Sequence, residues 1–512
     1  MTNLSSILTA SAANHPTKTA LVAGDTEVDY ATLDLFARMF AGALGDLGVA
    51  PGEHVALVLP NVPQFTVAYF GCHYAGNPVV PLNVLLTAEE LACHLDDAQA
   101  TVVVTWDLFL PAVEAATLGR PPGAAAAGNR TIIVAKADIN DLSAPEGTHN
   151  LTALVAGATP IDHAHPTTPE DTAVILYTSG TTGRAKGAEL THANLLANAK
   201  VPHQLVGLGA ETVALVALPL FHAFGMTVMH NAVLAVGGTL VLQPRFTASE
   251  AVALIERHRV TFFGGVPTMY VALLQLKAAD LTTVKWCVSG GAPMPAEVMA
   301  GVEERFGVTL LEGYGLSETS PVVSFTVPEL PRTAGSIGYA VPGVELALVD
   351  DAGRFVTTPD TRGEIAVRGN NVMKGYWRNP GATATAIVDG WFRTGDIGTF
   401  DVHGAYRIVD RKKDLIIRGG YNVYPREVEE VLHRHPAVAQ AAVVGVPHAR
   451  YGEDVKAVVT LKPGAAATPD DIITWAEPHL AAYKRPRIVE IRDALPVGPT
   501  GKVLKAALRT AA

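Results

Sequence analysis

The chain has little cysteine, little charge and no long uninterrupted hydrophobic run. Its three cysteines, Cys72, Cys93 and Cys287, show no paired spacing, which argues against a disulfide framework or a zinc site and fits a reducing compartment. Charged residues make up 17% of the chain and hydrophobic residues 49%, so a large core is expected and extended disorder is not. No basic residue precedes Lys18, so a secretory leader is not expected.

No segment is predicted to cross a membrane. The most hydrophobic region, residues 223–242, is interrupted by His230, Asn231 and glycines, and this pattern favours a buried helix followed by a strand. No tandem repeat of fixed period is present, which argues against a solenoid. The length of 512 residues allows two or more domains.

Apolar strands alternate with helical stretches along most of the chain. Residues 55–59 and 101–105 are predicted strands, and residues 65–74 a predicted helix between them. This alternation is typical of a mostly parallel sheet with helices on its faces. Further strands are predicted at 213–218, 260–264, 284–289 and 308–311. Each of these four strands is followed by a stretch with glycine, proline or polar residues. Ligands bind beyond the carboxyl ends of parallel strands, so we predict one pocket at these four ends.

The last part of the chain changes character. Glycines and short alternating runs in residues 333–410 indicate a smaller β subdomain, and the charged stretch Asp410–Asp414 is interpreted as a linker. Beyond it, strands at 439–446 and 455–461 and helices opening at Pro425 and at Thr468-Pro469 predict a compact α+β module. We therefore expect two domains, 1–410 and 411–512.

The stretch Tyr177–Gly187 is the strongest candidate for chemistry. It contains three glycines and four Thr or Ser hydroxyls, with Arg184 and Lys186, between a predicted strand at 172–176 and a capped helix start at Thr191. Glycines allow close backbone approach, and hydroxyls and cations bind oxyanions, so the stretch predicts a phosphate cradle. Its spacing does not fit a Walker A loop.

This stretch resembles the signature loop of the adenylate-forming superfamily, which includes acyl-CoA synthetases, luciferases and peptide-synthetase adenylation domains. The resemblance covers nearly the whole chain. It implies an α/β fold: a large N-terminal domain of parallel-type sheets covered by helices, with a β subdomain, and a small mobile C-terminal α+β domain. It also implies ATP as a substrate, with the β- and γ-phosphates held by Thr178, Ser179, Gly180, Thr181, Thr182, Gly183 and Lys186.

Three later motifs match the superfamily's nucleotide motifs. In Gly313–Thr319, the resemblance implies that Tyr314, between Gly313 and Gly315, stacks on adenine, that Thr319 contacts the α-phosphate and that Glu318 holds Mg²⁺. The small residues Gly290, Gly291, Ala292 and Pro293 resemble the loop beside the adenine. In the stretch Trp391–Asp396, Asp396 is expected to bind the ribose hydroxyls, with Arg411 as a second sugar contact.

The C-terminal module carries the remaining expected roles. Lys502, in Pro499-Thr500-Gly501-Lys502, matches the catalytic lysine of adenylation, whose charge brings a carboxylate and a phosphate together. Asp410 matches the hinge about which the terminal domain rotates between two half-reactions. The loop that then lines the thiol channel is matched by Arg418, Gly419, Gly420 and Tyr421.

The expected acyl pocket is apolar. His222, in Pro219-Leu-Phe-His222, is expected beside the substrate carboxylate, and a buried structural histidine is the alternative. The pocket wall is expected to consist of Phe224, Met226, Val266, Met269, Leu316 and Val323. Without an obvious cation or carboxylate among them, an apolar monocarboxylic acid is favoured. Medium-to-long fatty acids and aryl-propenoic acids both fit this wall.

The resemblance therefore predicts an acyl-CoA synthetase whose partners are a small carboxylic acid, ATP and coenzyme A, with Mg²⁺. Transfer of the acyl-AMP to a separate carrier protein, and a nucleotide-binding protein without catalysis, are the alternatives. No nucleic-acid partner is expected, and a transient membrane-surface contact and a homodimer are left open. The chain lacks a terminal Ser-Lys-Leu, so a cytoplasmic rather than peroxisomal location is expected.

Overall fold

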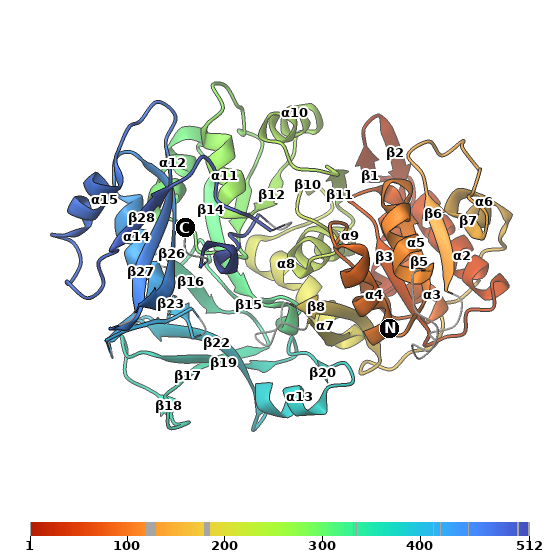
Figure 1. Cartoon of the computed structure of the whole chain (residues 1–512). Coiled ribbons are helices and arrows are strands. Elements are labelled where there is room, and N and C mark those ends of the chain that lie inside the picture. Colours follow the sequence, from red (N-terminus) through yellow and green to blue (C-terminus); the bar gives the residue numbers. More distant parts are fainter. Residues whose placement is uncertain are drawn as a thin grey trace.

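The computed structural model describes residues 2–118, 130–178, 185–330, 332, 335–412, 414–419, 421–448, 450–498 and 501–509. Figure 1 shows three β-sheets with helices packed around them. Two sheets are built from residues up to Arg411, and the third belongs to the C-terminal module. The expected α/β fold, with a large N-terminal part and a smaller C-terminal one, is confirmed.

The first sheet has eight strands in the order β20-β9-β8-β4-β3-β5-β6-β7. The six strands from β8 to β7 in this order run parallel, and β9 and β20 extend the sheet in antiparallel pairing. The strands are β3 (His54–Val58), β4 (Val79–Pro81), β5 (Ala100–Trp106), β6 (Thr131–Ala135), β7 (Thr148–Asn150), β8 (Thr172–Thr178), β9 (Lys186–Thr191) and β20 (Gly375–Tyr376).

Helices cover both faces of this sheet, as its parallel strands require. Val55 and Leu57 of β3 point to one face and share a core with α2 and α3, whereas Ala56 and Val58 point to the other face and pack with α4 and α5. The helices of this region are α1 (Ser6–Asn14), α2 (Tyr30–Asp46), α3 (Pro63–Ala75), α4 (Ala88–Asp97), η1 (Asp107–Phe109), α5 (Leu110–Leu118) and α6 (Leu151–Gly157).

The second sheet is larger and mixed. Its order is β18-β17-β19-β22-β23-β16-β15-β14-β13-β12-β10-β11-β1-β2, with β21 beside β22. The strands from β14 to β1 in this order are parallel, and the remainder pairs antiparallel. The parallel part consists of β1 (Thr19–Ala23), β10 (Val213–Val216), β11 (Thr239–Leu242), β12 (Phe262–Gly265), β13 (Trp286–Ser289) and β14 (Thr309–Gly315).

The antiparallel part corresponds to the expected β subdomain. It continues the large sheet instead of forming a separate one, because β15 pairs with β14. Its strands are β2 (Thr26–Asp29) at the far edge and β15 (Val322–Phe325), β16 (Ser336–Ala340), β17 (Val344–Val349), β18 (Phe355–Val356), β19 (Gly363–Gly369), β21 (Ile387–Val388), β22 (Trp391–Phe400) and β23 (Tyr406–Arg411).

The helices around the second sheet include one unusual element. Residues Phe224–Asn231 form a π-helix, η2, whose eight residues are all buried. The others are α7 (His192–Ala199), α8 (Val201–Val206), α9 (Ala232–Ala235), α10 (Ala248–His258), α11 (Pro267–Leu274), α12 (Ala296–Phe306), η3 (Ser317–Thr319) and α13 (Pro380–Ala386).

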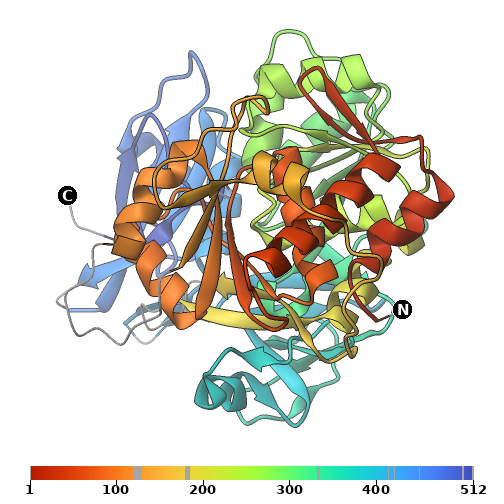
Figure 2. The ribbon, with the colours of Figure 1, turned by 90° about the vertical axis from the view of Figure 1, so that its right-hand side faces the viewer.

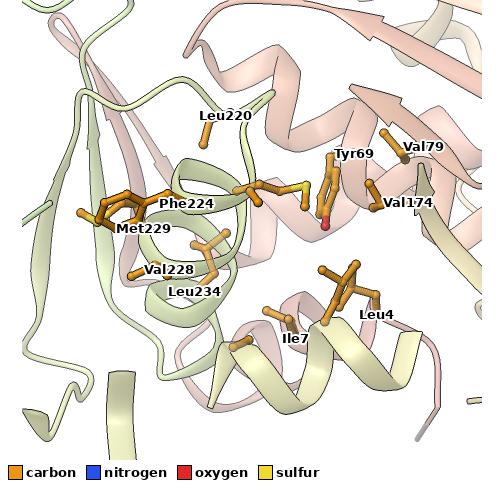
Figure 3. Close-up of a cluster of buried hydrophobic side chains, with 14 of the residues drawn as sticks. Leu4, Ile7, Tyr69, Val79, Val174, Leu220, Phe224, Val228, Met229 and Leu234 are labelled. Atoms are coloured by element: carbon orange, nitrogen blue, oxygen red, sulfur yellow. The ribbon is translucent and has the colours of Figure 1, made fainter. Parts of the chain in front are cut away.

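One continuous core joins the two sheets. Figure 3 shows Tyr69 of α3 beside Val79 and Val174 of the first sheet, with Met229 of η2 and Leu234 of α9 in the same buried cluster and Met229 on the side away from Tyr69. All five side chains are at most 1% exposed. Burying a large apolar side chain contributes about 1.5–3 kcal/mol, so this core fixes η2 against the first sheet.

The C-terminal module has its own core. Its five-stranded sheet consists of β24 (Ile416–Arg418), β25 (Tyr421–Val423), β26 (Val438–His448), β27 (Gly452–Leu461) and β28 (Ile488–Ile491). Helices α14 (Pro425–His433) and α15 (Pro469–Ala476) pack on it through Val428, Leu432 and Ile472, and η4 (Lys505–Leu508) follows. Figures 1 and 2 show this blue module beside the green part of the large sheet.

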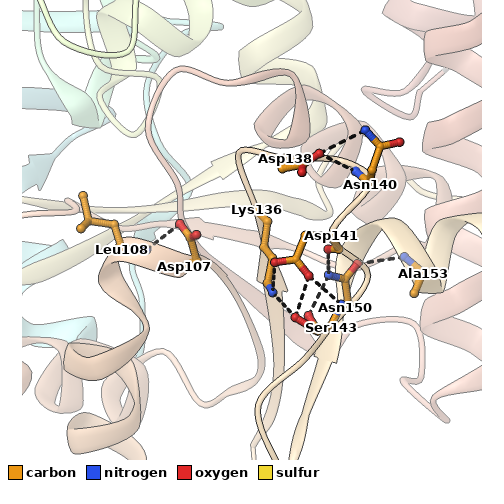
Figure 4. A network of polar contacts seen from close by, with 9 residues as sticks. All are labelled: Asp107, Leu108, Lys136, Asp138, Asn140, Asp141, Ser143, Asn150 and Ala153. Carbon is orange, nitrogen blue, oxygen red and sulfur yellow. Dashed lines mark hydrogen bonds and ion pairs between the residues drawn. The ribbon is translucent and has the colours of Figure 1, made fainter.

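A polar network fixes the connection between β6 and α6 at the surface (Figure 4). Lys136 Nζ lies 2.7 Å from Asp141 Oδ2, and Asn150 Nδ2 donates to the backbone oxygens of Asp141 and Ser143. The Asn150 side chain also caps α6 by accepting from Ala153 N. The hydrogen bond from Lys136 lowers the pKa of Asp141 to about 2.

The capped helix start predicted at Thr191 is confirmed, because Thr191 and Asn194 form a capping box at the start of α7. One local expectation needs correction: Lys186 begins strand β9, so a second, antiparallel strand lies between the phosphate stretch and this helix. Thr247 and Glu250 have the spacing of a capping box at the start of α10, but Thr247 makes no side-chain bond to the helix backbone, and Glu250 Oε2 accepts from Gln243 Nε2 at 3.0 Å. Among the described residues, no helix combines the length and apolarity needed to cross a bilayer.

Three buried histidines make stability depend on pH. Burial lowers the pKa of His192 and of His230 to about 4 and the pKa of His73 well below its usual value. Below pH 6.5 the unfolded chain binds protons that the folded chain does not, so folding loses stability as pH falls from 6.5 towards 4. At pH 5 each of the first two histidines costs about 2 kcal/mol.

We therefore expect the melting temperature to fall from pH 7 to pH 5, and His73→Phe to reduce that fall. Among the described residues, neither ring nitrogen of His73 has a hydrogen-bond partner, so phenylalanine removes a titrating group without removing a bond. Thermal unfolding at several pH values measures both effects, with the exposed His403→Phe as control. An unchanged pH slope in His73→Phe contradicts this account.

Candidate active site

A cavity of about 1650 Å³ lies between the two N-terminal sheets and the C-terminal module, and segments far apart in the sequence line it. They include β8, η2, the ends of β13 and β14, β22 and the loop before η4. Because the carboxyl ends of β12, β13 and β14 point into one region, the expectation of a single pocket beyond parallel strands is confirmed.

The phosphate stretch contributes the two ends of a hairpin. Thr178 of β8 and Lys186 of β9 are register partners, and both line the cavity. Lys186 Nζ lies 5.2 Å from the centroid of the Tyr376 ring, on the neighbouring strand β20. Ser179, Gly180, Thr181, Thr182 and Gly183 lie outside the described residues.

Glycines at two strand ends form a narrow wall. Gly290 and Gly291 follow β13, Gly313 and Gly315 end β14, and all four line the cavity with Tyr314. A Cβ on Gly315 would lie 1.9 Å from Pro321 O, and one on Gly290 3.1 Å from Gly313 O. Only glycine fits at such approaches. Ala292 and Pro293, from the same loop as Gly290, do not line the cavity.

Tyr314, Asp396 and Arg411 form a connected polar group at one side of the cavity. The Tyr314 hydroxyl donates to Asp396 Oδ2 at 2.6 Å, and Arg411 Nε lies 2.9 Å from Asp396 Oδ1. Arg411 and Asp396 are cross-strand partners on β23 and β22. Burial and the Asp396 carboxylate raise the pKa of Tyr314 well above its usual value, so the phenol stays protonated.

Glu318 and Thr319 are placed differently from one another. Glu318 lines the cavity, and its Oε1 accepts from the Tyr376 hydroxyl at 2.9 Å. Thr319 is fully buried, and its hydroxyl donates to Pro321 O at 2.7 Å and accepts from Leu316 N at 3.0 Å. The expected phosphate contact of Thr319 is therefore not seen: its hydroxyl closes the turn at η3 and does not face the cavity.

Lys502 reaches the cavity from the C-terminal module and approaches His222. Both residues line the cavity. The loop is held by Thr268 Oγ1 of α11, which donates to Gly501 O at 3.2 Å. Burial and, secondly, the Lys502 charge lower the pKa of His222 to about 4. His222 Nδ1 accepts from Phe224 N at 3.3 Å, which assigns the imidazole proton to Nε2.

The apolar part of the cavity differs from the expected wall. Phe224, Val266 and Leu316 line it, but Met226, Met269 and Val323 lie in the main buried core. On η2, Phe224 and Val228, four residues apart, line the cavity, whereas Met226 between them does not. Residues that sequence reasoning missed complete the wall: Val201, Pro202, Leu205, Val206, Phe221, Phe262, Val288, Val322 and Phe325.

The signal that points to α8 is the pairing of apolar residues at helical spacing, Val201 with Leu205 and Pro202 with Val206. A second region was also missed. Helix α4 lines the cavity beside Tyr177 with residues of mixed polarity: Glu89, Glu90, Cys93, His94 and Asp97.

The expected hinge and thiol-channel residues lie away from this cavity. Asp410 is 5% exposed, and its carboxylate accepts from Arg411 N and Arg426 N. Burial raises the pKa of Asp410 to about 6. Arg418 Nε lies 2.6 Å from Asp454 Oδ1, and Gly419 N donates to Tyr451 O. Tyr421 is 60% exposed and stacks on Tyr483 with centroids 4.8 Å apart. Gly420 lies outside the described residues.

The chain matches two family models and many known proteins. The AMP-binding enzyme model matches residues 8–377, and the AMP-binding enzyme C-terminal domain matches residues 427–502. A long-chain-fatty-acid–CoA ligase of Bacillus subtilis is 39% identical over 98% of this chain and 93% of its own length. A feruloyl-CoA synthase of an Amycolatopsis species is 37% identical over 96% of each chain.

Solved structures of CoA ligases are similar to this chain over nearly its whole length. The crystal structure of ATP-bound MatB from Rhodopseudomonas palustris has a TM-score of 0.90 and 33% identity, and covers 99% of this chain and 98% of its own. The structure of MatB without ligand covers the same shares at a TM-score of 0.80. The chain therefore belongs to the AMP-binding enzyme family of adenylate-forming enzymes, in which it is an AMP-forming acyl-CoA ligase.

Proposed function

We propose that the protein activates an apolar monocarboxylic acid, with a medium- or long-chain fatty acid favoured, and transfers it to coenzyme A. In the first step a carboxylate oxygen attacks the α-phosphorus of ATP and the bond to the β-phosphate oxygen breaks, giving acyl-AMP and pyrophosphate. In the second step the CoA thiolate attacks the acyl carbon and AMP leaves. ATP and CoA are cytoplasmic metabolites, so we assign the protein to the cytoplasm.

The observation that carries this proposal is the position of Lys502 beside His222. The first step brings a carboxylate against a phosphate, and two anions repel at about 4 kcal/mol for unit charges 4 Å apart at an effective dielectric of 20. A cation between them removes this penalty and stabilises the charge that develops on the phosphoryl oxygens. His222, neutral above pH 5 and protonated on Nε2, donates a hydrogen bond to the substrate carboxylate without adding charge.

The remaining cavity residues are assigned to the adenine, the ribose and the phosphates of ATP. The glycine wall at Gly290, Gly291, Gly313 and Gly315 accommodates the adenine with Tyr314 against its face. Asp396 accepts from the ribose hydroxyls, and Tyr314 and Arg411 fix its two oxygens for that task. Lys186 lies on the phosphate side, on the hairpin whose tip lies outside the described residues. We expect it to hold the pyrophosphate that leaves.

Glu318 fits a Mg²⁺ ligand. Its carboxylate faces the cavity, and Tyr376 binds only Oε1, which leaves Oε2 for a cation. Within the described ranges no three His, Cys, Asp or Glu side chains converge as a metal site. We therefore assign the other ligands to phosphate oxygens and water, as Mg²⁺ prefers with nucleotides. When bound, Mg²⁺ neutralises charge on the phosphates.

The two-step reaction requires two arrangements of the C-terminal module. We place the domain boundary at Asp410, between residues 1–410 and 411–512, and the module rotates there after adenylation. Rotation withdraws Lys502 and brings Arg418, Gly419, Gly420 and Tyr421 to the thiol channel. The exposed stacked rings of Tyr421 and Tyr483 are available to such a contact. Lys484, a further basic residue of the module, lies with its Nζ 2.5 Å from Glu427 Oε1 in the present arrangement.

The apolar wall supports a fatty acid more than a dicarboxylic or amino acid. From α8 to Phe325 it offers aliphatic and aromatic side chains, and its charged groups lie at the nucleotide end. A second candidate, an aryl-propenoic acid such as the substrate named for the feruloyl-CoA synthase, is supported by Phe221, Phe224 and Phe262, which suit a planar ring. Pyrophosphate release from a panel of acids distinguishes these candidates.

Lys502→Ala tests the assignment of the catalytic lysine. We expect acid-dependent ATP–pyrophosphate exchange to fall about 100- to 1000-fold, as when one stabilising group is removed from a transition state. ATP binding and thioester formation from supplied acyl-AMP remain within about twofold, since neither needs Lys502. The exposed Lys462→Ala, in the same module, is the matched control. Undiminished exchange in Lys502→Ala excludes the role.

Lys186→Ala tests the phosphate side of the cavity. We expect a decrease of about 10- to 100-fold in pyrophosphate exchange, because the charge that stabilises the departing pyrophosphate is lost. The second half-reaction, started from supplied acyl-AMP, contains no pyrophosphate and is spared. The rate of acyl-CoA formation from supplied acyl-AMP and CoA measures this second half-reaction separately. Equal loss in both half-reactions argues for a general structural effect.

The length of the acyl channel depends on Phe262 and Val206. Both side chains line the main cavity and also a smaller one of about 170 Å³. Phe262→Ala therefore joins the two spaces, and we expect the acid with the highest kcat/KM to become about two to four carbons longer, at about 1 kcal/mol per buried methylene. Val206→Phe is expected to shift the preference the other way. Competition assays with acids of graded length measure both shifts. If neither variant changes the preferred length, the chain does not pass between these residues.

A further inference from the structure

The C-terminal module contacts the rest of the protein at a second point, at the start of α14. Arg426, the second residue of α14, is 7% exposed. Its guanidinium leaves its own module: Nη1 donates to Ile408 O at 2.5 Å and Nη2 to Gly335 O at 3.5 Å. Nε donates to Glu430 Oε1 at 3.1 Å, within α14. A buried guanidinium thus bonds two backbone carbonyls of the N-terminal part.

Glu312 lies within the electrostatic reach of this guanidinium. Burial raises the pKa of Glu312 to about 7, and the Arg426 charge opposes that rise. Glu312 Oε1 accepts from Met294 N at 3.2 Å, whereas Oε2 has no hydrogen-bond partner in the part of the chain that the structure describes.

Glu312 lies between the Arg426 contact and the glycine segments that line the cavity. Glu312 directly precedes Gly313 in β14, and Met294 directly follows the loop that contains Gly290 and Gly291. One carboxyl group therefore ties together the two glycine segments that form the nucleotide wall. The charge of Arg426, which the bond to Gly335 O holds against the N-terminal part, acts on this carboxyl group.

We propose that Arg426 is a positioning residue that latches the C-terminal module in the arrangement in which Lys502 enters the cavity, and that couples this docking to the nucleotide wall through Glu312. The proposal rests on the two-step function above. Rotation about Asp410 carries α14 with the module, so Arg426 must leave Gly335 and Glu312 before thioester formation. The fold resembles ATP-bound MatB, at a TM-score of 0.90, more than the ligand-free form, at 0.80.

The latch requires the planar fork of arginine. Two carbonyl oxygens and a neighbouring carboxylate lie around one guanidinium, and a lysine ammonium on the same stem cannot bond all three in these directions. Both Arg426→Lys and Arg426→Met therefore weaken docking, with the larger effect for methionine, which also leaves Glu312 without a countercharge.

The test compares the two half-reactions in the full-length enzyme. In Arg426→Met we expect kcat for pyrophosphate exchange to fall about tenfold or more, because the docked population falls by that factor. Thioester formation from supplied acyl-AMP stays within about twofold of wild type or becomes faster. Arg434→Met, which removes an exposed arginine at the C-terminal end of the same helix, is the matched control and keeps both rates within about twofold. Thermal unfolding of each variant verifies that it is folded.

A double-mutant cycle tests the coupling to the nucleotide wall. If Arg426 acts on Glu312, the loss of exchange in Arg426→Met combined with Glu312→Gln is clearly smaller than the product of the single losses. Equal loss in both half-reactions, or unchanged exchange in Arg426→Met, overturns the latch, and multiplicative losses overturn the coupling. A wild-type enzyme without exchange on any acid of the panel refutes the proposed function instead, so the two failures are distinguishable.

Discussion

The repulsion between a carboxylate and a triphosphate is the constraint around which this structure is organised. A cation must stand between the two anions during the first step, and the candidate, Lys502, lies over 300 residues beyond the phosphate hairpin. Only docking of the C-terminal module brings it there, through the loop that Thr268 holds at Gly501. With the rotation proposed above, Lys502 is present for adenylation and absent afterwards, when the thiol needs access to the same acyl carbon.

The part of the site that belongs to the N-terminal sheets is built from strand ends. The parallel strands β12, β13 and β14 stop at the cavity, and glycines after them let backbone approach backbone within contact distance. Helices on both faces of the first sheet and the core between the sheets hold η2, and with it Phe224 and Val228, against the cavity. The nucleotide side is thus fixed by backbone geometry, whereas the acid side is fixed by apolar side chains. Variation of the acid within one fold follows from this division.

How far the sequence predicts the structure depends on how local the signal is. Strand ends, the Thr191 cap and the helix at Pro425 were predictable because periodicity and capping are local. The hairpin at Lys186 was not, since antiparallel pairing of β9 with β8 is a tertiary choice. Met226 was assigned to the wall by its place four residues after His222, a position in the chain that does not show which way the side chain of this buried helix points. Thr319 carries a motif hydroxyl, but the turn at η3 binds it. Nothing in the sequence around Arg426 indicates a bond to Gly335, 91 residues away.

The contact between the modules is polar where a permanent interface would be apolar. The C-terminal module keeps its own core, with Val428, Leu432 and Ile472 fully buried, so it remains folded when it moves. At Arg426 it instead buries a charge beside the carboxyl group of Glu312, and burying charged groups recovers little net free energy because desolvation offsets attraction. Such a contact fixes orientation through directional bonds while leaving the docked state only slightly favoured. An enzyme that must dock and release the same module in every turnover needs both properties, since an apolar interface of equal area would hold the module closed.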